Sequence, residues 1–187
     1  IIPHLAAVIV KEHSEEPNHW KKAFTIGEWM RLKGIPGLAH VDTRALTRRL
    51  RTYGTMKASL IIGRTPTEED RKRLAHFPLP QDQVVRVSTP HPYQCPGEGK
   101  RVVVLDFGMK ASIVHALTKR ECHVRVVPYH TTAAEILNWQ PDGVVLSNGP
   151  GNPKHVPYAV DTIKTLLGQV PIFGICLGHQ LLALACG

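Results

Sequence analysis

The chain has 187 residues, of which 43% are hydrophobic and 20% charged, as in an ordinary globular protein of one domain or two small ones. No apolar run approaches the roughly 20 residues that a membrane-spanning helix needs, and the first residues lack the basic start of a secretory signal. The net charge is +8, and residues 1–100 hold 16 basic and 10 acidic side chains without a basic tract interleaved with aromatics, so we expect a solvated or protein-contacting face and no nucleic-acid or membrane partner.

Residues 1–87 are expected to form a small α/β subdomain. Its expected elements are a strand over 4–10, helices over 25–34 and 42–54, and a strand over 58–63. The helix over 42–54 is the clearest, because Asp42 can cap its first turn and Gly54 can end it. One face of this helix is basic and is expected to lie against solvent or another protein. That face consists of Arg44, Arg48 and Arg51.

A linker is expected over residues 88–99, because this stretch is rich in proline and glycine and has neither a helical nor a strand period. Behind it, residues 100–187 alternate between strand and helix. The expected strands cover 101–107, 123–129, 143–148 and 170–175, and the expected helices cover 109–121, 132–139, 156–168 and the residues after Cys176. This alternation predicts an open parallel sheet with helices on both faces.

The four cysteines are widely spaced, and none forms a Cys-x-x-Cys pair. Neither a zinc site nor a disulfide framework is therefore expected, and no metal is assigned. Reduced thiols fit a cytoplasmic protein. The four are Cys95, Cys122, Cys176 and Cys186.

The stretch FGICLGHQ, residues 173–180, places Cys176 between two glycines where a buried strand turns into a helix. Gly-x-Cys-x-Gly is the thiol counterpart of the nucleophile elbow, in which the nucleophile holds a strained backbone. The thiol would project from the carboxyl edge of the sheet, where open α/β sheets bind ligands, and the start of a helix favours the thiolate. The N–H of Leu177 faces the same position and is a candidate oxyanion donor.

The loop SNGPGNP, residues 147–153, is expected to supply a second donor. It follows another predicted strand and so opens at the same sheet edge, where the N–H of Gly149 or Gly151 can approach a ligand closely. Taken alone, Cys176 reads equally well as a buried structural cysteine in a tight turn. Two elements placed independently at one sheet edge favour catalysis instead.

FGICLGHQLLALA and LSNGPGNP resemble the motifs of the class I (triad) glutamine amidotransferases, and LDFGMK and PDGVVLSNGPG resemble one group of them in particular. GIPGLAHVDTRALTRRLR in the first half is similar to the small, glutaminase subunits of carbamoyl-phosphate synthases, so the resemblance runs through essentially the whole chain. It implies a flavodoxin-like sheet on which Cys176 attacks glutamine, forms a γ-glutamyl thioester and releases ammonia. It also implies an oxyanion hole formed by Leu177 and Gly149. The implied contacts to L-glutamine are Gly149, Gly151, Leu177 and Gln180.

The resemblance implies a partner as well. In this family the ammonia passes to a large subunit, which uses ATP and bicarbonate to make carbamoyl phosphate for arginine and pyrimidine synthesis. ATP and Mg are therefore expected on the large subunit and no cofactor on this chain, with the two subunits forming a cytoplasmic heterodimer.

The departures from the family concern the catalytic base. In the family a His and a Glu complete the triad well downstream of the elbow, whereas this chain ends 11 residues after Cys176. Part of the family's first domain, which gives a serine to the glutamine site, is also expected before Ile1. We therefore expect a fragment that is inactive alone, with His179, structural in the family, as the first substitute base to consider. The alternatives are a non-catalytic fragment that keeps the fold and the partner-binding surface, or another amidotransferase or cysteine hydrolase.

Overall fold

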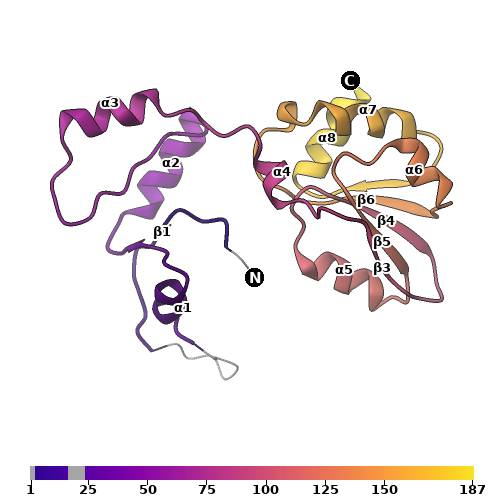
Figure 1. The fold of residues 1–187 in the computed structure, drawn as a ribbon, viewed down its shortest axis with the longest axis horizontal. Helices are drawn as coiled ribbons and strands as arrows, with labels where there is room; N and C mark the ends of the chain where they lie inside the picture. The colour runs from indigo at the N-terminus through magenta and orange to yellow at the C-terminus, as the bar shows by residue number, and fades with distance from the viewer. Residues whose placement is uncertain (1–2, 17–23) are drawn as a thin grey trace. The chain divides into compact units, whose positions relative to one another are not determined.

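The computed structural model describes residues 3–16 and 24–187 (Figure 1). The chain divides into two compact units, Ile1–Leu79 and Pro80–Gly187. The second unit thus begins ahead of residues 88–99, the segment expected to be a linker.

Helices make up most of the regular structure that is described in the first unit. Its elements are β1 (Val8–Ile9), α1 (Ile26–Leu32), β2 (Gly37–Leu38), α2 (Thr43–Tyr53) and α3 (Glu68–His76). The predictions for α2 are confirmed, because the Asp42 side chain accepts a hydrogen bond from the N–H of Ala45 and Gly54 ends the helix at φ 77°. The short strands β1 and β2 pair in parallel.

Two expectations for the first unit differ from the structure. The strand predicted over residues 58–63 is wrong, because this stretch has no regular structure and no strand pairs with it among the described residues. Helix α3 was not predicted, since its sequence EEDRKRLAH is too charged to show an apolar stripe. Its start is nevertheless written in the sequence as a capping box, in which Thr67 and Asp70 bond each other's backbone N–H groups.

The second unit is built on a five-stranded sheet in the order β3-β5-β4-β6-β7. The strands are β3 (Tyr93–Cys95), β4 (Arg101–Asp106), β5 (His123–Pro128), β6 (Gly143–Leu146) and β7 (Ile172–Gly174). The predicted parallel sheet is confirmed for β4 to β7. Strand β3 lies inside the expected linker and pairs antiparallel with β5, so the sheet is mixed and mostly parallel.

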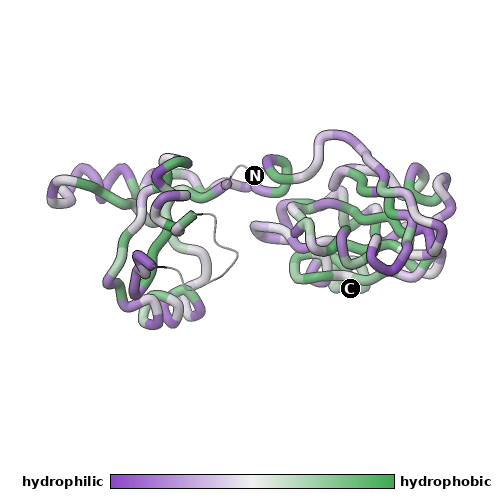
Figure 2. The backbone as a smooth tube through the Cα atoms, turned by 90° about the horizontal axis from the view of Figure 1, so that it is seen from below, coloured by the Kyte–Doolittle hydropathy of each residue, from purple (hydrophilic) through white to green (hydrophobic). Residues whose placement is uncertain are grey.

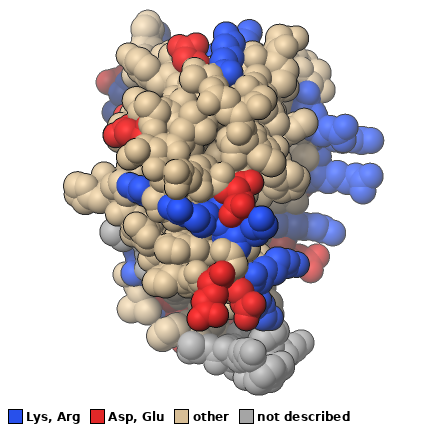
Figure 3. Space-filling model, turned by 90° about the vertical axis from the view of Figure 1, so that its right-hand side faces the viewer, with Lys and Arg blue, Asp and Glu red and all other residues tan. Residues whose placement is uncertain are grey.

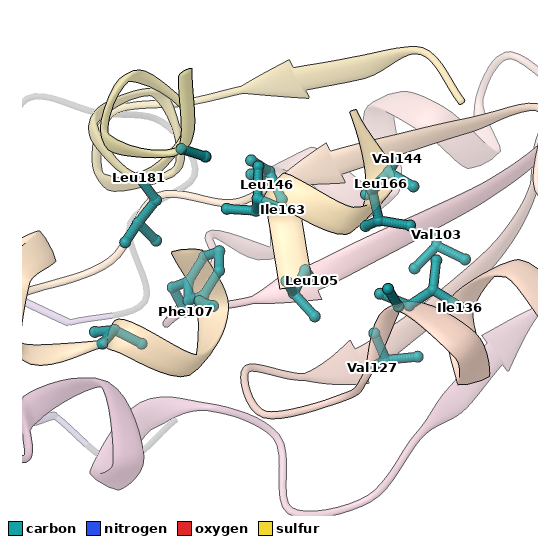
Figure 4. Packing of buried hydrophobic residues seen from close by; sticks show 14 of the residues in the cluster. Val103, Leu105, Phe107, Val127, Ile136, Val144, Leu146, Ile163, Leu166 and Leu181 are labelled. Carbon is teal, nitrogen blue, oxygen red and sulfur yellow. The ribbon is translucent and has the colours of Figure 1, made fainter. Parts of the chain in front are cut away.

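Helices cover both faces of this sheet, as predicted. They are α4 (Gln83–Val87), α5 (Ala111–Thr118), α6 (Ala133–Asn138), α7 (Pro157–Leu166) and α8 (Leu177–Cys186), with the 3-10 turn η1 (Pro153–His155) ahead of α7. Alternate residues of β4 point to opposite faces: Val103 and Leu105 join the cluster packed under α6, α7 and α8, and Val104 joins the cluster under α5. Figure 2 colours the backbone by hydropathy and shows hydrophobic stretches in green, and Figure 4 shows residues of the larger cluster.

Polar contacts fix the starts of neighbouring strands. The Asp142 carboxylate, just ahead of β6, accepts hydrogen bonds from the backbone N–H of Arg101 (2.8 Å) and from Lys100 Nζ (3.0 Å). These bonds, the backbone one first, lower the pKa of Asp142 from its ordinary value of 3.8. The carboxylate therefore links the amino end of β6 to that of β4.

The surface carries charges of both signs. On the face drawn in Figure 3, Lys and Arg side chains are interspersed with Asp and Glu. Within the described ranges, no helix has the length and apolar content needed to cross a membrane.

The core of the second unit predicts a sharp contrast between two positions on α7. Ile163 is fully buried in the larger cluster, whereas Tyr158 on the same helix is 73% exposed. We expect Ile163→Ala to lower the free energy of unfolding by about 2–5 kcal/mol, and Tyr158→Ala by less than about 1 kcal/mol. Urea denaturation of the two variants measures this difference, and equal losses would contradict the packing described.

Candidate active site

Cys176 stands at the corner between β7 and α8, as the sequence predicts. Its backbone has φ 52° and ψ −108°, which a non-glycine residue adopts only under strain. The prediction of a strained backbone at this position is confirmed. The cysteine is exposed, so its thiol is accessible at the carboxyl edge of the sheet.

At the two glycines that flank Cys176, there is no room for a side chain. A Cβ at Gly174 would lie 2.7 Å from the backbone N and Cα of His179. A Cβ at Gly178 would lie 2.3 Å from the carbonyl oxygen of Leu146, at the end of β6. The turn is therefore sharp because the backbone packs directly on backbone at both glycines.

The loop after β6 lies against this elbow. The N–H of Ile175 donates to the carbonyl of Leu146 (2.9 Å), and the N–H of Gly178 donates to the carbonyl of Ser147 (3.1 Å). A Cβ at Gly149 would lie 2.3 Å from the carbonyl oxygen of Phe107 and 2.8 Å from a methyl carbon of Leu177. The structure thus brings the two predicted motifs together at one sheet edge.

Several backbone N–H groups at this edge have no hydrogen-bond partner among the described residues, as is usual in the first turn of a helix. They include that of Leu177, which is buried in the first turn of α8, and that of Gly149, which is half-buried in the loop. Buried N–H groups are nearly always paired in folded proteins. Two unpaired groups on adjoining elements beside a thiol are what an oxyanion-binding site requires.

A third loop, which follows β4, is bonded to the loop after β6. Asp106 is only 4% exposed, and its carboxylate accepts hydrogen bonds from the N–H groups of Gly108 (2.8 Å), Met109 (2.9 Å) and Thr89 (2.8 Å). The Asn148 side chain donates to the carbonyl of Gly108 (3.0 Å) and accepts from the N–H of Lys110 (3.1 Å). Sequence reasoning missed both side chains, although each follows a buried strand within LDFG and LSNG.

Helix α4 was also missed, and it lies at the same edge. A Cβ at Gly151, whose φ is 89°, would come within 2.4 Å of Gln83 Oε1. The Ser88 hydroxyl, directly after α4, accepts a hydrogen bond from the N–H of Tyr129 at the end of β5 (3.1 Å). Helix α4, near the start of the second unit, therefore contacts the glycine loop directly.

The remaining predicted residues lie on the first turn of α8. His179 and Gln180 are both exposed, and the N–H of Gln180 donates to the Cys176 carbonyl (3.1 Å). No histidine is hydrogen-bonded to Cys176 in the part of the chain that the structure describes, and no group of three or more His, Cys, Asp or Glu there could hold a metal ion. The described residues thus bring Cys176 together with the loop that carries Gly149, and none of their histidines is bonded to the thiol.

In comparison with known proteins, two family models match the chain, one in each half. Residues 103–187 match the family model for class-I glutamine amidotransferases, and residues 2–60 match that for the carbamoyl-phosphate synthase small chain, CPSase domain. Over all 187 residues, the chain is 52% identical to the carbamoyl phosphate synthase small chain of Bacillus caldolyticus and 51% identical to the pyrimidine-specific small chain of Bacillus subtilis (strain 168). Each match covers 51% of the relative, so the chain spans about half the length of the curated relatives it matches.

The backbone contact at Gly178 predicts that a single methyl group disrupts the site. In Gly178→Ala, the new Cβ must displace β6 or the elbow, and we expect a loss of about 2 kcal/mol or more in unfolding free energy with slower alkylation of Cys176 by iodoacetamide. Gly143→Ala is the matched control, because its Cβ would meet only the carbonyl of Pro171 at 3.6 Å. A Gly178→Ala variant as stable and reactive as Gly143→Ala would contradict the close approach.

Proposed function

From the confirmed resemblance of this chain to the class I glutamine amidotransferases, and to carbamoyl phosphate synthase small chains in particular, we propose that it carries the nucleophile of a glutaminase. The observation that carries the proposal is the strained Cys176 beside two unpaired N–H groups. In this function the thiolate attacks the side-chain amide carbon of glutamine. The carbon–nitrogen bond then breaks, ammonia leaves with a proton supplied by a general acid, and water hydrolyses the γ-glutamyl thioester to glutamate.

The roles proposed for the residues around Cys176 follow from their positions in the loop after β6 and in the first turn of α8. The N–H groups of Leu177 and Gly149 stabilise the negative oxygen of the tetrahedral intermediate. Gly149 and Gly151 let the loop backbone approach the substrate, because neither has a side chain to hold it away. Gln180 is exposed in the first turn of α8, and its side-chain amide is proposed to hydrogen-bond the bound glutamine.

The proposed partner is a large synthetase subunit that receives the ammonia, binds ATP and Mg, and makes carbamoyl phosphate from bicarbonate in the cytoplasm. The product would serve arginine or pyrimidine synthesis, and no cofactor is assigned to this chain. Arg44, Arg48 and Arg51 of α2 are all exposed and are proposed to face that subunit or solvent, with no nucleic acid bound. The alternative is a non-catalytic role, which the lack of a base beside Cys176 within the described ranges favours for these 187 residues alone.

A chimera tests the proposed nucleophile. The 187 residues replace the matching half of the Bacillus subtilis small chain, so that the relative supplies the other half of its own length. We expect ammonia release from L-glutamine that falls by at least about a thousandfold in Cys176→Ala and is retained in Cys186→Ser, which removes an exposed thiol at the other end of α8. Full turnover in Cys176→Ala would refute the proposal.

The isolated chain is expected to behave differently from the chimera. Cys176 alone can neither protonate the leaving amine nor activate the deacylating water, and loss of general acid–base help costs about two to four orders of magnitude. We therefore expect negligible ammonia release from the 187-residue polypeptide, with Cys176 still alkylated faster than Cys122 or Cys186. Robust turnover that depends on Cys176 would show that the chain contains a base, and His179→Ala would be the next variant.

A further inference from the structure

Ser147 is a buried hydroxyl at the end of β6 to which the proposed mechanism gives no role. Its side chain is inaccessible to solvent. Its Oγ accepts a hydrogen bond from the N–H of Phe107 (2.9 Å) and donates to the carbonyl oxygen of Asn148 (2.8 Å). Because the hydroxyl oxygen accepts the hydrogen bond from the Phe107 N–H, its own hydrogen is free to be donated to the Asn148 carbonyl.

The geometry of the peptide bond carries this contact to the next residue. A trans peptide is planar, and its C=O and N–H point in opposite directions. No cis peptide bond occurs among the described residues, so the bond between Asn148 and Gly149 is trans. A hydroxyl that holds the Asn148 carbonyl toward the buried Ser147 side chain therefore turns the Gly149 N–H away from Ser147.

Ser147 is also tied to the elbow itself. Its carbonyl accepts the hydrogen bond from the N–H of Gly178, at the start of α8. Ser147 thus constrains the peptide that carries the Gly149 N–H and also holds the first turn of α8, which carries the Leu177 N–H. We propose that Ser147 is a positioning residue whose hydroxyl aims the Gly149 N–H at the oxyanion, an inference that rests on the proposed function.

The experiment compares two reactions of the Cys176 thiolate in the 187-residue chain. Attack on p-nitrophenyl acetate forms a thioester and expels p-nitrophenolate through a tetrahedral oxyanion, and this leaving group needs no general acid. Alkylation by iodoacetamide displaces iodide at a saturated carbon and forms no oxyanion. A Gly149 N–H that points at the oxyanion therefore accelerates acylation only. A general structural defect, or a change in the fraction of Cys176 present as thiolate, changes the rates of both acylation and alkylation.

In Ser147→Ala we expect the acylation rate at Cys176 to fall about tenfold or more, and the alkylation rate to stay within about twofold. Ser147→Thr keeps the hydroxyl and is expected to recover most of the acylation rate. Thr162→Val is the matched control, since it removes a hydroxyl that donates to the Thr131 carbonyl (3.4 Å) elsewhere in the same unit, and it should move neither rate. Equal falls in both rates, or no change in either, would overturn the inference.

Two further measurements distinguish a failure of the proposed nucleophile from a failure of the role proposed for Ser147. A phenolate burst that persists in Cys176→Ala would refute the proposed nucleophile, whereas a Cys176-dependent burst unaffected by Ser147→Ala would refute only the role of Ser147. If Ser147→Ala does not fold, the wild-type chain provides a second measurement. A small aldehyde is added, with which the Cys176 thiol forms a hemithioacetal, and the backbone amide resonances are recorded by NMR before and after. A shift of the Gly149 amide is expected, and an unchanged resonance would overturn the inference.

Discussion

The site depends on one close approach, that of the α8 backbone to the end of β6. Gly178 lies so near the carbonyl of Leu146 that a Cβ would come within 2.3 Å of it, and its N–H bonds the carbonyl of the next residue, Ser147. This approach forces the chain to turn sharply at Cys176, which accounts for the positive φ there. Packing of the buried face of α8, through Leu177 and Leu181, holds the strained turn in place.

The same approach brings three loops into one bonded unit. Asp106 organises the loop after β4, Asn148 ties that loop to the one after β6, and Ser147 ties the latter to α8. A parallel sheet makes this possible, because the carboxyl ends of β4, β6 and β7 meet at one edge. The backbone that carries the Leu177 and Gly149 N–H groups is bonded into this unit, which is the preorganisation that the proposed oxyanion hole requires.

The alternation of apolar strands with amphipathic helices predicted β4 to β7 and α5 to α8, because burial on both faces leaves a strong pattern. The strained elbow at Cys176 was predictable too, since only its flanking glycines permit the turn. Helix α4 and strand β3 were not, because each is short and held by tertiary contacts, such as the burial of Val84, that no local pattern records. The positions of Asp106 and Asn148 likewise depend on which loops meet. The apolar run at residues 58–63 failed as a strand because strand formation requires a neighbour.

The proposed function requires that the strained cysteine form a covalent bond with the carbonyl carbon of its substrate. The most direct measurement is acid quenching of the chimera during turnover of isotope-labelled L-glutamine, followed by peptide mass spectrometry. We expect a labelled γ-glutamyl group on the peptide that contains Cys176, and hydroxylamine should remove it. Turnover with no label on that peptide, or with label on Cys95, Cys122 or Cys186, would contradict the proposed function.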